Sequence, residues 1–136
     1  MAMGFVYKQQ WTLRMSNPME TVSDFESIKT RLRQFVEARD WEQFHSPKNL
    51  AMALVGEVGE LVEHFQWLTE EESSNLADEK KQAVSEELAD VQIYLIMLAR
   101  KLDIDLLSVV KEKIEKNEAK YPVDKAQGKS LKYTDL

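Results

Sequence analysis

Four acidic residues form two pairs of identical spacing, and such pairs can hold a divalent cation. Glu57 and Glu60 lie three residues apart, as do Glu87 and Asp90. On a helix, residues three apart share one face, with roughly 5–6 Å between their Cβ atoms. Each pair borders a run of apolar positions. If two helices pack along those positions, the four carboxylates converge.

Converging carboxylates repel one another, and burial of an unpaired charge is costly. A hard cation removes that cost. Mg²⁺ suits the group because it takes oxygen ligands, needs few carboxylates and keeps waters or phosphate oxygens as its other ligands. The competing interpretation is a non-catalytic helical interaction module whose acids only make it soluble. A titration with Mg²⁺ separates the two interpretations.

The spacing of apolar residues predicts four helices that would carry these acids. We expect them near residues 23–40, 47–68, 80–102 and 106–120. Ser23 or Asp24 can cap the first helix, and Ser46 followed by Pro47 is a typical helix start. The segment Asp103–Asp105 is expected to end the third helix and cap the fourth.

Two apolar seams are expected to form the core between the second and third helices. One consists of Leu50, Leu54, Val58, Leu61, Phe65 and Leu68, and the other of Val84, Leu88, Val91, Leu95, Leu98 and Leu102. The second has a heptad-like spacing that favours near-parallel packing against a neighbour. Ile93, Ile96 and Met97 add apolar surface outside this seam, which is typical of a helix buried centrally or at a subunit interface.

The fold class that follows is all-α, a four-helix bundle with short connections. The chain has 136 residues, enough for one domain, and its four glycines and three prolines argue against a many-stranded sheet. We expect residues 1–22 to be a poorly ordered N-terminal extension. Residues 23–121 would form the helical domain and residues 122–136 a surface tail.

The composition excludes several other classes. The chain has no cysteine, which excludes a disulfide scaffold or a thiolate zinc site and fits a reducing compartment, so we expect a cytoplasmic protein. No apolar run approaches the ~20 residues that span a bilayer, so no membrane partner is expected. The net charge of −6 disfavours a nucleic acid polymer as partner. A bridging cation would still admit a nucleotide.

Two stretches carry a resemblance to a known family. The sequence "GEVGELVEHFQW" at residues 56–67, followed by "EELADV" at residues 86–91, resembles the E-x-x-E … E-x-x-D motif of the MazG-type all-α nucleoside triphosphate pyrophosphohydrolases. The pattern is most similar to the dCTP pyrophosphatase branch, through "RDWEQFHSPKNL" at 39–50, "DVQIYL" at 90–95 and "KIEKNEAKYP" at 113–122. The resemblance covers about Phe25 to Leu136.

The resemblance implies Mg²⁺-dependent hydrolysis of a nucleoside triphosphate between its α and β phosphates, with dCTP or a modified dCTP as the expected substrate. It also implies that four acids are the Mg²⁺ ligands: Glu57, Glu60, Glu87 and Asp90. One of these acids, Glu60 or Glu57 in our interpretation, would orient or deprotonate the attacking water. A neighbour such as Glu63 or Glu86 is an alternative that the sequence leaves open.

The resemblance also indicates substrate contacts, each of which could instead be ordinary surface or core packing. Lys113, Asn117 and Tyr121 form one stripe on the fourth helix and suit phosphate or sugar. Tyr94 would lie under the sugar. The base-side candidates are Trp41, Phe44, His45 and Trp67, because aromatic faces stack on a nucleobase for ~1–3 kcal/mol each. His64 lies outside the family motif and is interpreted as a surface or edge residue.

The resemblance further implies a homotetramer, a dimer of dimers, with sites built partly from a neighbouring chain. The role would be to cleanse the nucleotide pool of unwanted dNTPs. A hydrolase of other (d)NTPs, such as dUTP or dATP, is the alternative within the same chemistry.

Overall fold

The structure, a computed structural model, describes residues 18–136, with side chains from Asp24 onward. Its elements are α2 (Pro18–Glu37), η1 (Glu42–Phe44), α3 (Pro47–Glu63), α4 (Glu70–Ser74), α5 (Asp78–Lys101), α6 (Leu106–Lys120), α7 (Val123–Ala126) and η2 (Tyr133–Asp135). No strand forms among these residues, so the predicted all-α class is confirmed. The chain divides into two units, Met1–Asn49 and Leu50–Leu136.

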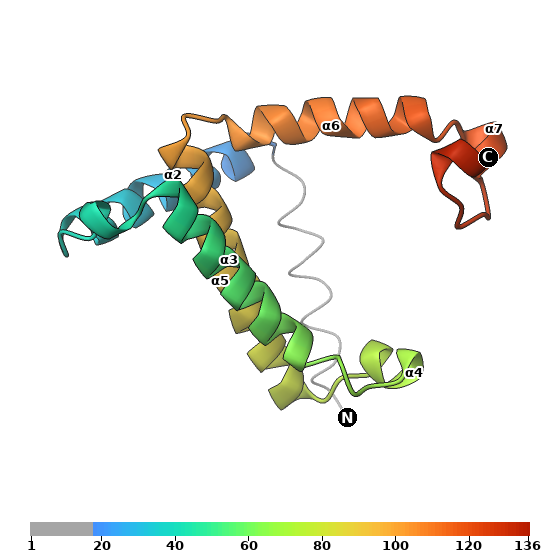
Figure 1. Cartoon of the computed structure of the whole chain (residues 1–136), viewed down its shortest axis with the longest axis horizontal. Coiled ribbons are helices and arrows are strands. Elements are labelled where there is room, and N and C mark those ends of the chain that lie inside the picture. The colour runs from blue at the N-terminus through green and yellow to red at the C-terminus, as the bar shows by residue number, and fades with distance from the viewer. Residues whose placement is uncertain (1–17) are drawn as a thin grey trace. The chain divides into compact units, whose positions relative to one another are not determined.

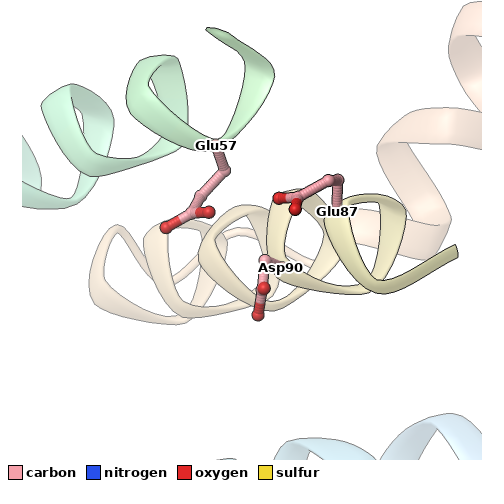
Figure 2. Close-up of side chains that lie close together, drawn as sticks. All are labelled: Glu57, Glu87 and Asp90. Carbon is pink, nitrogen blue, oxygen red and sulfur yellow. The ribbon is translucent and has the colours of Figure 1, made fainter. Parts of the chain in front are cut away.

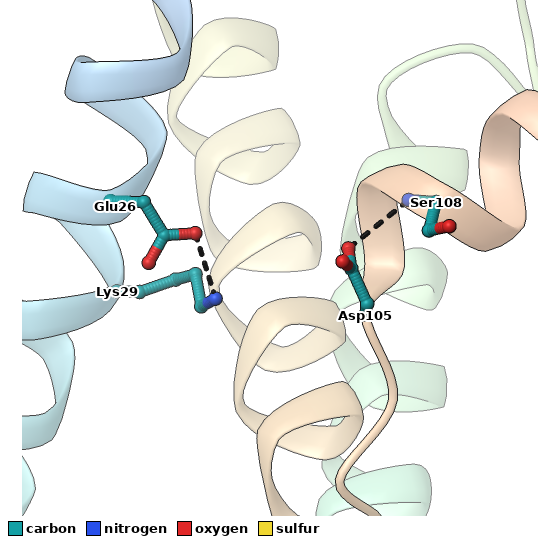
Figure 3. A network of polar contacts seen from close by, with 4 residues as sticks. All are labelled: Glu26, Lys29, Asp105 and Ser108. Atoms are coloured by element: carbon teal, nitrogen blue, oxygen red, sulfur yellow. Dashed lines mark hydrogen bonds and ion pairs between the residues drawn. The ribbon is translucent and has the colours of Figure 1, made fainter.

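Helix α2 in the first unit begins at Pro18, so the predicted start at Ser23 or Asp24 is wrong. Proline is well tolerated in the first turn of a helix, where its missing N–H has no partner to lose. Further along, the Lys29 ammonium and the Glu26 carboxylate form an ion pair at 2.9 Å on one helix face (Figure 3). The expected extension over residues 1–22 stays a prediction, since residues 1–17 lie outside the described residues.

Helices α2 and α5 end in the same way, each with an aspartate in the left-handed region. Asp40 and Asp103 both have a φ of 54°. Aspartate tolerates this conformation better than most residues, because its short polar side chain can bond locally. In each case the next amide donates to a carbonyl five residues back, from Trp41 to Val36 at 3.1 Å and from Ile104 to Ala99 at 2.9 Å. These bonds satisfy carbonyls that the helix end would otherwise leave without partners.

The start of α3 is as predicted, whereas its end is not. The Ser46 hydroxyl accepts the Asn49 amide at 3.1 Å, and Pro47 is the first helical residue. The helix ends at Glu63, five residues before the predicted end at Leu68. Tight turns follow it, one of them closed by the Leu68 amide on the Phe65 carbonyl at 2.9 Å.

The fourth predicted helix is confirmed as α6, with the predicted bounds. The Asp105 carboxylate caps it by accepting the Ser108 amide at 3.1 Å, as expected from the segment that precedes it (Figure 3). The predicted surface tail contains two short helices, α7 and η2, and their residues are mostly exposed.

In the second unit, α3 and α5 lie side by side and run in opposite directions (Figure 1). Helix α6 leads away from this pair and contains no buried residue. The packed part of the unit is therefore the α3–α5 pair, with α6 as a projecting arm. The pair provides the rigid frame for the acidic residues.

Burial on α5 differs from the predicted seam. Ile96 and Met97, which lie outside the seam, are buried, whereas the seam residues Leu88 and Leu102 are 52% and 49% exposed. The helix is apolar on more than one face. Periodicity alone could not tell which of these faces is covered, and this part of the seam prediction is wrong.

Within residues 18–136, every helix is too short or too polar to cross a lipid bilayer.

Candidate metal centre

On α3, a carboxylate occupies a position of the helix face that packs. Leu54, Glu57 and Leu61 are spaced by three and four residues, and all three are partly buried. Val58, which we expected in the seam, is 41% exposed. At 100° per residue Leu61 lies between Glu57 and Leu54 around the helix, and Val58 lies outside this arc, 40° beyond Leu54. The predicted seam was therefore wrong by one residue at this point.

The same shift occurs on α5. Glu87 is partly buried, whereas its apolar neighbour Leu88 is more than half exposed. In both helices an acid directly precedes an apolar residue. The prediction placed the apolar residue in the core because its side chain is apolar. The helix geometry instead turns the acid toward the partner helix. Glu57 and Glu87 are partly buried and Asp90 is exposed, so the carboxylates lie at the edge of the contact between the two helices.

Three of the acids come together across the pair. Glu57 of α3 points toward α5, which supplies Glu87 and Asp90 (Figure 2). One oxygen from each lies within 4.8 Å of the others. Two oxygens on one Ca²⁺ ion lie at most about 5.2 Å apart, and two on one Mg²⁺ ion at most about 4.2 Å, so the three oxygens are close enough for Ca²⁺ and need to close up by up to about 0.6 Å for Mg²⁺. The donor set, all carboxylate oxygen, fits a hard divalent cation.

The electrostatics of the cluster agree with a site for positive charge. The pKa of the Glu57 carboxyl is raised above its ordinary value of 4.5, first by partial burial and then by the charges of Glu60, Asp90 and Glu87. Each of these causes disfavours the carboxylate form. A cation among the carboxylates would reverse the effect.

Glu60 stands apart from the other three acids. It is exposed and is not part of the converging group, although its charge contributes to the raised pKa of Glu57. Its oxygens are thus near the cluster and open to solvent. Glu63 and Glu86, the alternative candidates for orienting water, are also exposed.

His64 joins the cluster, although the sequence interpretation placed it at the surface or an edge. Its Nε2 lies 3.8 Å from Oε1 of Glu87, and both side chains are about four-fifths covered, with 21% and 19% exposed. The sequence did contain a sign of this position. His64 follows Glu57 by seven residues, two helical turns, so both residues lie on the same face.

Two base-side candidates of the first unit, Trp41 and His45, form an aromatic group with Phe35, whereas Phe44 is 59% exposed. The rings of Trp41 and His45 meet edge to face at 6.4 Å, and Trp41 meets Phe35 at 5.7 Å. The Arg39 guanidinium lies 3.7 Å above the Phe35 ring and 5.9 Å from that of Trp41. Trp41 itself remains 42% exposed, so its surface is open to a planar ligand.

The other substrate candidates lie in the second unit and are spread along it. Trp67 is 86% exposed in the turn after α3, and Tyr94 is partly buried on α5. Lys113 and Asn117 are exposed on α6, which leads away from the α3–α5 pair (Figure 1). Tyr121 packs edge to face on Tyr133 at 6.1 Å. Within one chain, the structure does not bring the α6 residues to the carboxylates.

Comparison with known proteins identifies the family. The profile of the MazG-like family matches residues 53–136, which include the three converging carboxylates, His64 and all of α6. The chain belongs to the MazG-like family. The family assignment expected from the two acid motifs is confirmed.

Curated relatives of this MazG-like chain carry a more specific name. The dCTP pyrophosphatase 1 of Rattus norvegicus is 48% identical over 113 residues, and that of Homo sapiens is 46% identical over the same length. These alignments cover 82% of this chain and 66% of each relative. The chain therefore spans just under two thirds of the length of the curated relatives it matches.

A solved structure is also similar. The crystal structure of a pyrophosphatase from Archaeoglobus fulgidus superimposes with a TM-score of 0.64 at 42% sequence identity. The match covers 78% of this chain and 94% of the archaeal protein. The similarity extends over most of the helical part of the MazG-like chain.

Proposed function

We propose that this protein is a Mg²⁺-dependent nucleoside triphosphate pyrophosphohydrolase that converts dCTP, or a modified dCTP, to dCMP and pyrophosphate. The observation that carries the proposal is the convergence of Glu57, Glu87 and Asp90 from two helices. Support comes from relatives that are named dCTP pyrophosphatases and are nearly half identical. Removal of unwanted dNTPs from the nucleotide pool is the role that fits this activity.

The roles of the carboxylates follow from their positions. Glu57, Glu87 and Asp90 would hold the cation, which when bound neutralises phosphate charge and can activate a water. Glu60, exposed beside the cluster, is placed to orient that water and accept its proton. The water oxygen then bonds to a phosphorus of the α–β anhydride. The bond between that phosphorus and the bridging oxygen breaks, and dCMP and pyrophosphate separate.

The rest of the nucleotide would be bound by the remaining candidates. Trp41, His45 and Trp67 offer exposed or partly exposed rings for the base, and Tyr94 offers one for the sugar. Lys113, Asn117 and Tyr121 supply a cation and hydrogen-bond donors for phosphate or sugar. Because α6 projects from the pair, its residues would act on a site completed by a neighbouring chain.

Assembly into a homotetramer, a dimer of dimers, is part of the proposal. Helix α3 exposes Met52, Val55 and Val62, which are 64%, 70% and 52% accessible and lie on one helix face. An apolar stripe of this kind suits contact with a second helix.

The experiment that tests the function is an assay of pyrophosphate release over dCTP, 5-methyl-dCTP, dUTP, dATP and CTP with Mg²⁺. We expect dCTP or its methylated form to give the highest kcat/KM. Glu87→Gln should lower kcat/KM by at least about 100-fold, because it removes a ligand charge. Glu79→Gln, the same change on the same helix outside the cluster, should leave the rate unchanged. A folded protein that releases pyrophosphate from none of the five nucleotides contradicts the proposal.

A further inference from the structure

His64 is a nitrogen donor beside the converging carboxylates, and it is not one of the four acids of the family motif. It lies in the turn after α3 and reaches across to the middle of α5. Its Nε2 is 3.8 Å from Oε1 of Glu87, and neither side chain is more than about one-fifth exposed. When the imidazole is protonated, this is a contact between opposite charges that joins the turn after α3 to α5.

Glu87 has two oxygens and can serve two partners at once. One of its oxygens belongs to the group that also contains Glu57 and Asp90. A carboxylate that binds a metal through one oxygen commonly accepts a hydrogen bond on its free lone pairs, and this bond fixes its orientation. His64 is placed to donate such a bond, since a neutral imidazole carries one N–H and a protonated imidazole carries two.

We propose that His64 is a positioning residue for Glu87, which orients this carboxylate toward the cation by donating a hydrogen bond from Nε2. The inference rests on the proposed metal site and adds to it a residue outside the acid motifs. At 3.8 Å the two atoms form an ion-pair contact. A shift of about 1 Å, within reach of a rotation of either side chain, brings them to the ~2.8 Å of a charge-assisted bond.

The position of His64 along the chain explains why its side chain can reach Glu87. Glu57 lies on the face of α3 that packs on α5, and His64 follows it by seven residues, in the turn after the helix, where it contacts Glu87 of α5. Gln66, two residues further on, is exposed and turns away from that face. It provides a matched control for changes in the same turn.

Calorimetric titration of Mg²⁺ into the nucleotide-free protein tests the proposal without relying on activity. His64→Leu keeps the bulk of the side chain but removes its donors, and it should weaken Mg²⁺ binding about tenfold. His64→Gln retains an N–H donor and should bind within about threefold of the wild type. Gln66→Ala should be unchanged. The variants should rank in the same order by the Mg²⁺ concentration that gives half-maximal turnover. Their KM for the nucleotide should differ from that of the wild type by less than twofold.

The outcomes separate this inference from the proposed function. If the wild type binds Mg²⁺ and His64→Leu binds it within twofold, His64 does not position Glu87, although the metal site stands. If His64→Gln binds Mg²⁺ as weakly as His64→Leu does, a hydrogen bond from residue 64 does not support Mg²⁺ binding, and the proposal is wrong. Pulsed electron paramagnetic resonance with bound Mn²⁺ gives a further test. A direct ¹⁴N coupling to His64 would show that His64 is itself a metal ligand, and this result would also overturn the proposal. A wild type that binds no divalent cation overturns the metal site and this inference together.

Discussion

Glu57 is a carboxylate at a helix position that usually carries an apolar side chain. Partial burial and three neighbouring acids raise its pKa above 4.5. The folded protein therefore binds a proton at Glu57 more tightly than the unfolded chain does. Without a cation, this group lowers the stability of the fold increasingly as pH rises from 4.5 through the folded pKa.

Replacement of Glu57 by glutamine should raise the melting temperature of the metal-free protein, because the unfavourable charge disappears. The gain should be larger at pH 7 than at pH 4, where the wild-type group is already largely protonated. Differential scanning calorimetry in EDTA measures both values. The same variant should lose Mg²⁺ binding, so stability and metal affinity move in opposite directions.

Glu112→Gln, on the exposed face of α6, is the control for the general effect of removing one negative charge. Its melting temperature should change little at either pH. If Glu57→Gln is no more stable than this control at pH 7, the repulsion inferred at the cluster is absent.

The residues of the cluster were predictable from the sequence, but their depth was not. Glu57, Glu87 and Asp90 were found because acids three apart beside apolar residues share a helix face. The sequence could not show that Glu57 faces the partner helix in place of Val58, since apolar character alone placed the valine inward. The spacing of seven residues from Glu57 indicated the side of the chain on which His64 lies, but its contact with Glu87 depends on how the two helices pack.

Helix α4 begins with a capping box, in which Thr69 and Glu72 bond to each other's backbone. The Glu72 carboxylate accepts the Thr69 amide at 2.8 Å, and the Thr69 hydroxyl accepts the Glu72 amide at 3.2 Å. These bonds lower the pKa of Glu72, mainly through the Thr69 backbone and then through its hydroxyl. The stabilising contribution is therefore present above pH 4.5 and is lost as pH falls through the folded pKa.

Thr69→Ala should destabilise this short helix by about 1 kcal/mol, which corresponds to roughly fivefold faster hydrogen exchange of the Glu72 amide. In the wild type, the protection of the Glu72 amide against hydrogen exchange should decrease as the pH is lowered from 6 to 3. This protection is calculated after correction for the intrinsic exchange rate at each pH. Amides in the middle of α5 report on global unfolding and serve as the reference. Equal protection of the Glu72 amide in both proteins would show that the cap does not hold α4.

The end of α5 gives a second test at the scale of elements. Asp103 has a φ of 54°, a conformation that is strained for β-branched residues. Asp103→Val should lower the free energy of unfolding by about 1–2 kcal/mol, whereas Asp103→Gly should change it by less than about 0.5 kcal/mol. Urea denaturation measures both. A valine variant as stable as the glycine variant would contradict the inferred strain.

The starts of α3 and α6 were predicted correctly. Ser46 and Asp105 have side chains that cap by a local hydrogen bond, and this chemistry can be seen in the sequence. The end of α3 was missed because Phe65 and Leu68 continue its apolar spacing, although the backbone already turns there. The start of α2 was missed because residues that favour caps, such as Asp24, also fit inside a helix.

At the scale of the whole molecule, a single copy leaves much apolar surface exposed. Met52, Val55 and Val62 form a stripe on one face of α3, and each is at least half accessible. The sequence predicted four long helices but could not show which apolar faces stay open within one chain. Contact of this stripe with a second copy would bury it.

The mass in solution should therefore be a multiple of the 15.8 kDa chain, and four copies are expected. Val55→Glu places a charge in the stripe and should shift the mass toward smaller species in size-exclusion chromatography with light scattering. Val123→Glu makes the same change at a 75% exposed position on α7 and should leave the mass unaltered. A wild type that elutes as a monomer would contradict assembly through α3.

The most direct test of the central claim, cleavage of the α–β anhydride at a carboxylate-held cation, is ³¹P nuclear magnetic resonance of dCTP with the purified protein. With Mg²⁺ we expect the dCTP signals to be replaced by those of dCMP and pyrophosphate. Excess EDTA, or the Glu87→Gln variant, should leave dCTP intact. Formation of dCDP and inorganic phosphate, or of dCMP at an undiminished rate in EDTA, would contradict the claim.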